Sequence, residues 1–297
     1  MGVPAGIGTI DTMIGLPTAD RRWWAESMSA MLLDKDSKGG FEHAASYMYK
    51  DLPDNSAAET DDDARIAELL HEMDSHGVEQ GLIPVSFQDV GSLRAVREHP
   101  DRLLGSYLVD PNRGMDGVAD LVRAVEEAGV IAAAFFPSGC VPQVPINNKK
   151  IFPIYAKCVE LDIPIFINVG VPGPRVPMKA QKVSHLDEVC WFFPELRVVM
   201  RHGAEPWTEL AVKLMVKYPN LFYSTSAFAP RYYPKAIVDF ANSSRGAGRV
   251  VYAGYYPSGL TLERIFTELG DVAFKEDVWP KFLRDNARAV LKLEEAP

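Results

Sequence analysis

Residues 196–207 read LRVVMRHGAEPW and place ionisable side chains directly after an apolar segment. The first half of this stretch has the composition of a buried strand. Arg201, His202 and Glu205 come where that strand would end, around a glycine and before a Pro-Trp pair that can open a helix. A strand that delivers such groups to a turn before a helix is typical of the sites of α/β proteins. A single histidine at a strand end is just as commonly a structural hydrogen-bonding group, so both interpretations stay open.

The elements that must position these residues follow from an alternation of apolar and amphipathic segments. We expect strands at 7–12, 80–85, 103–109, 130–136, 163–169, 196–201, 221–225 and 250–253. We expect helices at 61–76, 89–99, 114–128, 149–161, 185–193, 206–218, 232–241, 260–269, 278–285 and 287–293. Such alternation predicts a parallel sheet, and eight units within 297 residues favour a (β/α)8 TIM barrel that forms one domain over residues 1–297.

A long insertion follows the first predicted strand. Residues 13–60 mix aromatic side chains with Gly, Pro, Ser and charged residues, and a short helix is expected near 20–33. A connection of this length in a compact domain is usually a functional loop. We expect a lid or mouth-lining segment here, and the aromatic residues fit a subunit interface or plain packing equally well.

Composition excludes several classes of function. The net charge is −9 and the acidic residues are spread along the chain, which argues against nucleic-acid binding because that requires a basic surface. The apolar runs are too short for a membrane span, and the first thirty residues lack the pattern of a secretory signal. Three widely separated cysteines predict neither a disulfide framework nor a structural zinc site. The expected compartment is the cytoplasm.

Several strand ends resemble one family. The segments PIFINVG (164–170), HLDEVCWFFPELRVVMRHGAEPW (185–207), KYPNLFYSTS (217–226) and RVVYAGYYP (249–257) occur in the order and spacing of the amidohydrolase-related barrels. They resemble the branch that holds aminocarboxymuconate-semialdehyde decarboxylase and the resorcylate-type decarboxylases. Residues 10–15 stand where that branch has its first metal-binding motif.

The departures from the family pattern concern the metal site. The family holds a divalent metal with two histidines after the first strand, a histidine after the fifth and an aspartate after the eighth, with a sixth-strand histidine nearby. Only that last residue matches, as His202. The four ligand positions fall here on Met13, Gly15, Asn168 and Tyr255. These residues are poor ligands for zinc or a similar ion. We therefore expect neither a catalytic metal nor another cofactor. The less favoured alternative is an unusual metal set of His202, Asp11 and Glu205.

Acid–base chemistry is what these residues offer without a metal. His202 titrates near neutrality in its ordinary state and is the expected proton carrier. Asp11 or Glu205 is expected to orient it or to act as a second base, which would favour the imidazolium form. Tyr255 is expected to donate a hydrogen bond to a developing oxyanion. The predicted catalytic residues are His202, Glu205, Asp11 and Tyr255.

The remaining strand-end residues are predicted to bind the substrate. Arg175 and Arg201 offer bidentate pairing with a carboxylate. The full predicted substrate-binding set is Asn168, Arg175, Arg201, Tyr256 and Met13. Each has a structural alternative: Tyr255 and Asn168 as fillers of a lost metal site, Arg201 in an ion pair and Arg175 in solvent.

Two classes of function remain open. The favoured prediction is a metal-independent hydrolase that acts on a small carboxylated or aromatic metabolite. A non-oxidative decarboxylase, or a non-catalytic binding or partner subunit, is the alternative. Convergence of His202, Tyr255 and an acid on an open pocket favours an enzyme, whereas a mouth plugged by Tyr255 and Met13 favours a binder. The resemblance also implies association into homo-oligomers, which light scattering would test.

Overall fold

The computed structural model describes residue 4 and residues 6–17, 30–35 and 61–294. Within these ranges, eight strands form one sheet in sequence order, and every neighbouring pair is parallel. The strands are β1 (Thr9–Asp11), β2 (Val78–Val85), β3 (Leu103–Leu108), β4 (Val130–Phe135), β5 (Ile165–Asn168), β6 (Val198–Arg201), β7 (Leu221–Ser224) and β8 (Val250–Val251). Most of the predicted helix near 20–33 and most of the 13–60 insertion lie outside the described residues, and the described residues 30–33 form a turn and irregular backbone.

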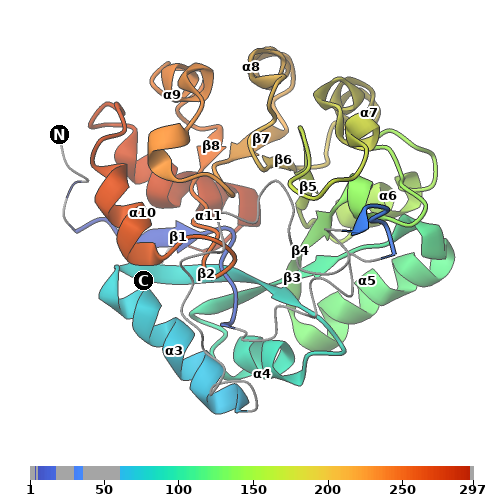
Figure 1. Cartoon of the computed structure of the whole chain (residues 1–297), viewed down its shortest axis with the longest axis horizontal. Helices are drawn as coiled ribbons and strands as arrows, with labels where there is room; N and C mark the ends of the chain where they lie inside the picture. The colour runs from blue at the N-terminus through green and yellow to red at the C-terminus, as the bar shows by residue number, and fades with distance from the viewer. Residues whose placement is uncertain (1–3, 5, 18–29, 36–60, 295–297) are drawn as a thin grey trace.

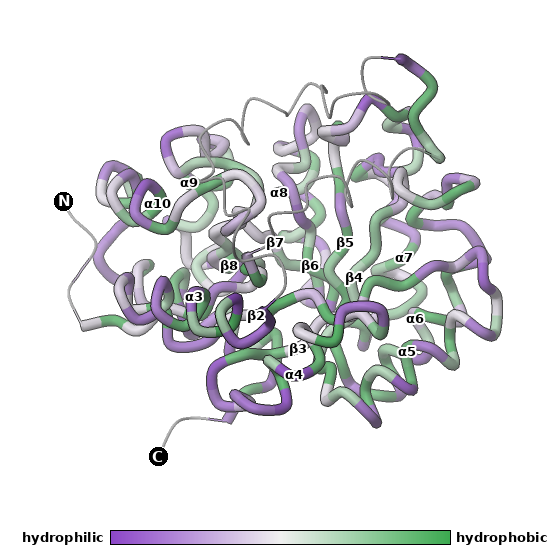
Figure 2. The backbone as a smooth tube through the Cα atoms, turned by 60° about the horizontal axis from the view of Figure 1, so that its bottom comes forward, coloured by the Kyte–Doolittle hydropathy of each residue, from purple (hydrophilic) through white to green (hydrophobic). Residues whose placement is uncertain are grey.

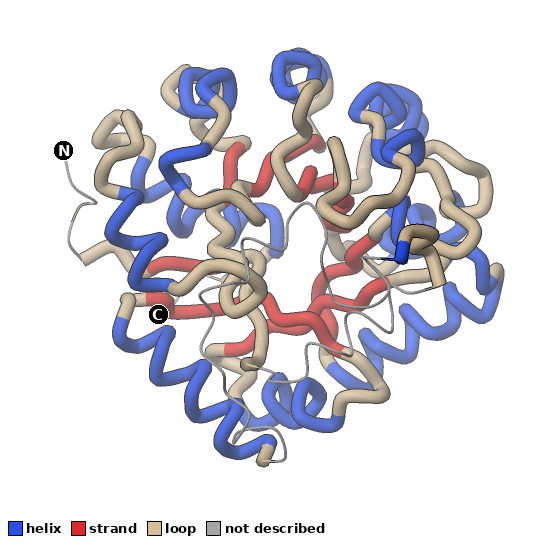
Figure 3. Tube along the Cα trace, viewed as in Figure 1, coloured by secondary structure: helices blue, strands red, loops and turns tan. Residues whose placement is uncertain are grey.

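Backbone hydrogen bonds join β1 to the segment that follows β8. The amide of Thr12 donates to the carbonyl of Tyr252 (3.2 Å), and that of Tyr255 donates to the carbonyl of Met13 (2.8 Å). Gly15 in turn donates to the segment just beyond Tyr255. These contacts bring the first and last strands together, so the curled sheet of Figure 3 has the (β/α)8 TIM-barrel architecture that the sequence predicted.

Helices surround the strands (Figure 1). They are α3 (Asp62–Ser75), α4 (Val90–Glu98), α5 (Met115–Ala128), α6 (Phe152–Glu160), α7 (Leu186–Phe192), α8 (Thr208–Lys217), α9 (Lys235–Ala241), α10 (Leu262–Leu269) and α11 (Asn286–Leu291). Helix α3 begins where Asp61 accepts a hydrogen bond from the amide of Asp63, and α5 ends at a left-handed Gly129. The last two predicted helices are continuous, because a π-helical turn at Lys281–Asp285 runs directly into α11. None of the described helices is both long and apolar enough to cross a bilayer.

The core has two layers because strand side chains alternate between the two faces of the sheet. Outward-facing residues pack under the helices, and Figure 2 shows the strands as mostly apolar segments. The inward-facing cluster takes one residue from almost every strand: Ile10, Leu82, Leu104, Ala132, Phe166, Val199 and Val251. The residues two positions further along each strand therefore face inward at the C-terminal mouth of the barrel, where TIM barrels carry their chemistry.

Candidate functional site at the barrel mouth

Three polar residues form a row across neighbouring strands at the mouth. Asn168, the last residue of β5, is in register with Arg201, the last residue of β6. The next pairing joins Met200 to Tyr223, which brings Ser224 beside Arg201. Arg201 and Ser224 are buried and Asn168 is half-buried. The hydroxyl of Ser224 has no hydrogen-bond partner among the described residues. The row thus presents hydrogen-bonding groups toward the barrel interior.

Arg201 is a buried cation in this row. Its side chain reaches across the barrel, where Nη2 donates to the carbonyl of Thr12 (3.3 Å), and its guanidinium carbon lies 4.6 Å from the ring centre of Phe166. Its Nε–H has no hydrogen-bond acceptor among the described residues, and none of their carboxylates forms an ion pair with it. Burial lowers the pKa of Arg201 to about 10, with Tyr255 and Asp11 acting in the opposite direction. The group therefore stays protonated at neutral pH.

His202 follows at the end of β6 and is partly buried. Ser226, from the end of β7, is its partner: Ser226 Oγ accepts the backbone N–H of His202 and lies 3.2 Å from ring atom Nδ1. The ring of Tyr255 packs edge-on at 5.3 Å. Burial, reinforced by the charge of Arg201, lowers the pKa of His202 to about 3. The free protein therefore carries a neutral imidazole, which corrects our expectation that a carboxylate would favour the imidazolium form.

Glu205 does not join this group. Its side chain is exposed, and the described partner of the His202 ring is Ser226. The reason is the backbone after β6, where His202, Gly203 and Ala204 all have positive φ angles of 66°, 90° and 60°. This left-handed run turns the chain, so that the third residue after the histidine points to solvent. The expectation that Glu205 orients His202 is not supported by this geometry.

The side chain of Asp11 faces the helix layer and not the barrel interior. Its Oδ1 accepts the amides of Met13 and Gly254, both at 2.9 Å, and so fixes the junction of β1 and β8. A Cβ placed on Gly254 would come within 2.5 Å of Asp11 Oδ2 and 2.8 Å of the Tyr252 hydroxyl. Tyr252 belongs to the layer under the helices, where it packs against Phe266 of α10. The free carboxylate oxygen thus faces outward, and we assign Asp11 a structural role in place of the predicted catalytic one.

Burial also changes the protonation of Asp11. The carboxyl group is fully buried, which raises its pKa to about 7, although the amides of Gly254 and Met13 and the charge of Arg201 act in the opposite direction. Neither Asp11 Oδ2 nor the Tyr252 hydroxyl has a hydrogen-bond partner among the described residues. With a pKa of about 7, the carboxyl group is partly protonated at neutral pH, and the protonated form is less costly to bury than the charged one.

Tyr255 and Met13 meet at the mouth through their backbones. Tyr255 has a φ of 70°, and its amide bonds to the carbonyl of Met13. Positive φ is costly for residues other than glycine, and four of the six such non-glycine residues described follow β6, β7 or β8: His202, Ala204, Ala227 and Tyr255. Gly203 lies among them, since an added Cβ would approach Phe228 to 2.4 Å. Strained backbone at strand ends is common at functional sites.

Two predicted substrate-binding residues point elsewhere. Arg175 is exposed and forms an ion pair with Asp34 at 2.8 Å. Tyr256 is buried under α3, where its hydroxyl lies 3.4 Å from Glu68. Tyr256 directly follows Tyr255, but the left-handed backbone of Tyr255 turns the chain there, and Tyr256 lies on the side of α3.

The predicted catalytic and substrate-binding sets leave out two groups of the site. Ser226 lies 24 residues beyond His202, and its role depends on the pairing of β6 with β7. Thr12 contributes a backbone carbonyl to Arg201, which its side-chain type does not reveal. A serine directly after the predicted strand at 221–225 was the available signal for Ser226.

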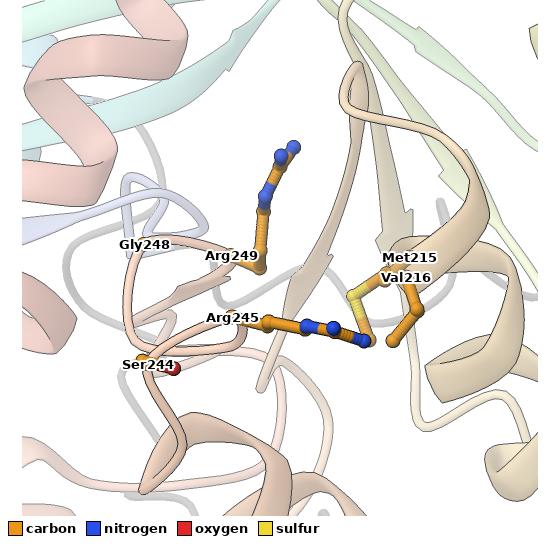
Figure 4. A pocket seen from close by; sticks show the side chains of 6 residues that line it. All are labelled: Met215, Val216, Ser244, Arg245, Gly248 and Arg249. Atoms are coloured by element: carbon orange, nitrogen blue, oxygen red, sulfur yellow. The ribbon is translucent and has the colours of Figure 1, made fainter.

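A surface hollow of about 370 Å³ lies at the opposite end of the barrel. Figure 4 shows Arg245 and Arg249 extending from the segment that leads into β8, beside the last turn of α8. Cations next to a helix C-terminus interact favourably with the helix dipole. These arginines therefore have a structural explanation and lie apart from the mouth.

The residues at the mouth do not fit the divalent metal of the resembling family. Gly15 offers no side-chain donor, and the charge of Arg201, which disfavours protonation of His202, disfavours a second cation as well. Asp11 faces away and Glu205 is exposed, so the alternative set with His202 is not assembled. Among the described residues, no three His, Cys, Asp or Glu side chains are grouped so that they could hold a metal ion.

A TIM barrel with a polar row and strained backbone at its C-terminal mouth is the architecture of a large class of enzymes. Within that class, the sequence profile of the amidohydrolase family matches residues 18–293, so this chain belongs to the amidohydrolase family. No curated relative matches the sequence.

Solved structures share the fold at low sequence identity. An uncharacterised TIM-barrel protein from Bordetella bronchiseptica is 19% identical, with a TM-score of 0.72 over 96% of this chain and 98% of the other. The 5-carboxyvanillate decarboxylase of Novosphingobium aromaticivorans, complexed with manganese and 4-hydroxy-3-methoxy-5-nitrobenzoic acid, is 17% identical, with a TM-score of 0.65 over 99% and 98%. The 4-oxalomesaconate hydratase of Rhodopseudomonas palustris is 19% identical, with a TM-score of 0.59 over 96% and 95%. At these identities the likeness shows the fold.

Proposed function

We propose that this protein is a non-oxidative decarboxylase of a small, carboxylated aromatic metabolite, and that it works without a metal. The observation that carries the proposal is the buried Arg201 guanidinium beside a neutral His202 at the mouth. Decarboxylases of carboxyvanillate and dihydroxybenzoate are prominent among the matching structures, which supports this reaction over the hydrolysis that we first favoured.

The reaction needs one proton and one bond cleavage. The proton adds to the carbon that bears the carboxylate, the bond from that carbon to the carboxylate breaks, and its electron pair returns to the substrate as CO2 leaves. His202 is the proposed proton donor, because its ring lies at the mouth between Ser226 and Tyr255. It must gain a proton before it can give one. An anionic substrate offsets the charge of Arg201 and thereby favours that protonation.

The supporting groups follow from the same geometry. Ser226 holds the His202 ring through Nδ1 and leaves Nε2 for the substrate. Tyr255 lies edge-on to that ring and supplies a phenol near Arg201. Asn168, in register with Arg201, is the proposed hydrogen-bonding partner of a substrate oxygen.

Release of CO2 from a panel of hydroxybenzoates and related carboxylic acids tests the proposal. The panel should include 2,6-dihydroxybenzoate and 5-carboxyvanillate, and the protein should be treated with a chelator beforehand. The proposal predicts turnover of at least one compound by the chelator-treated protein and its loss in His202→Ala. Turnover that is insensitive to His202→Ala would contradict the mechanism.

A non-catalytic binding protein is the second candidate. The packing of buried Tyr255 against half-buried His202 favours it. Ligand binding with no turnover across the panel would select this candidate.

A further inference from the structure

We propose that Arg201 is the anion-binding residue of the mouth and that its guanidinium binds the carboxylate of the ligand, providing the positive charge that a metal provides in the manganese-bound relative. This inference rests on the proposed function for the chemical class of the ligand. Its geometric basis is independent of turnover.

The first step of the argument is that Arg201 is an incompletely satisfied charge. Arg201 is 6% exposed, yet its side chain has one described hydrogen-bond acceptor, the carbonyl of Thr12. A guanidinium has five N–H donors in a planar fork, and its buried Nε–H has no acceptor among the described residues. A buried charge without a carboxylate partner lowers stability, so its presence calls for a compensating ligand.

The second step is that the neighbours of Arg201 are arranged for an anion. Ser224 contributes a fully buried hydroxyl without a described partner, and Asn168 is in register on the other side. The ring of Phe166 forms the floor under the guanidinium. The planar guanidinium lies over an aromatic ring, with a hydroxyl and an amide on the neighbouring strands. This arrangement matches a carboxylate in shape and charge.

The third step is that other charges compete poorly for the guanidinium. Asp11 forms no described ion pair with Arg201, because its second oxygen faces the helix layer, and the two groups interact only as more distant charges. Glu205 is exposed, and Arg175 is engaged by Asp34 at the surface. Among the described residues, Arg201 is thus the buried cation that remains for a ligand.

Calorimetric titration of the full chain with formate, acetate, benzoate and the neutral benzamide tests the inference. Formate and acetate are the smallest of these carboxylates and need the least space beside the guanidinium. The variants are Arg201→Met, Arg201→Lys and, as a matched control, Arg245→Met at the opposite end of the barrel. We expect the wild type to bind at least one anion, Arg201→Met to weaken that binding roughly 10- to 100-fold, and Arg201→Lys to fall between them. Benzamide binding and the Arg245→Met variant should show no such loss.

Each result decides the inference. Unchanged anion affinity in both Arg201 variants overturns it, as does a wild type that binds none of the three anions at millimolar concentration or that binds benzamide as tightly as benzoate. If Arg201→Met fails to fold, the affinity of Arg201→Lys alone decides. Anion binding at Arg201 without CO2 release from any carboxylate would refute the proposed decarboxylase while leaving this inference intact. CO2 release that is retained in Arg201→Met would refute the anion-binding role of Arg201 and leave the proposed decarboxylase intact.

Discussion

Asp11 and Arg201 are two buried ionisable groups near the C-terminal mouth of the barrel, and they face opposite sides of the sheet. Asp11 sits at the junction of β1 and β8, where two backbone amides hold one oxygen and the other faces the helix layer. Arg201 sits at the end of β6 and faces the barrel interior beside buried Ser224 and half-buried Asn168. Burial pushes both groups toward neutrality, but only the arginine faces the barrel interior. The side of the sheet on which each charge lies is therefore the basis for the structural role assigned to Asp11 and the binding role proposed for Arg201.

The largest expected effect is on turnover. We expect His202→Ala to lower the rate of CO2 release by about a thousandfold, because the proton donor is lost, with a Tm within a few degrees of the wild type. Asp11→Asn should keep turnover within a few-fold, since it preserves the acceptor for Met13 and Gly254. Steady-state kinetics on the two variants checks this. A large loss of turnover in Asp11→Asn at unchanged stability would undo the comparison.

Variants of the two residues should also differ in their effect on the free energy of unfolding. Asp11→Ala leaves two buried amides without their acceptor and should cost about 2–4 kcal/mol. Arg201→Met replaces a buried charge by an apolar side chain of similar length, so the free energy of unfolding should stay the same or rise. Urea denaturation followed by circular dichroism measures both. A strongly destabilised Arg201→Met would show that Arg201 is chiefly structural.

The pH dependence of stability should report Asp11. The pKa of its carboxyl group is about 7 in the folded protein and 3.8 for an unperturbed aspartate, so the folded protein binds more protons between these values. The resulting contribution to stability is present at low pH and is lost as the pH rises through 7. The wild type should therefore lose roughly 1–3 kcal/mol more than Asp11→Asn between pH 5 and pH 8. Parallel stability curves for the two proteins would contradict the raised pKa.

The smallest expected effect concerns the His202 ring. Its pKa is lowered to about 3, by burial first and by Arg201 second. In an NMR titration, the ring signals of His202 should stay in the neutral position from pH 8 down to about pH 4.5. Arg201→Met removes the second cause and should raise that pKa by up to about one unit. An unchanged titration in the variant would mean that the arginine charge does not reach the ring.

Part of this arrangement could be predicted from sequence alone. The alternation of apolar strands with helical patterns predicted the barrel, and the strand ends indicated His202, Tyr255 and Arg201 as neighbours, because C-terminal strand ends share one rim. The orientation of Asp11 was missed, although a two-residue period starting from the inward Ile10 indicates that Asp11 faces outward. The partner of His202 was misassigned because nearness in sequence favoured Glu205, whereas strand pairing placed Ser226 beside the ring.

The central claim is that a guanidinium, and not a metal, supplies the positive charge of this mouth. Elemental analysis tests it most directly, on protein produced with added manganese and zinc and purified without a chelator. The account predicts a metal content far below one ion per chain. About one manganese, zinc or iron per chain, lost in His202→Ala, would contradict it.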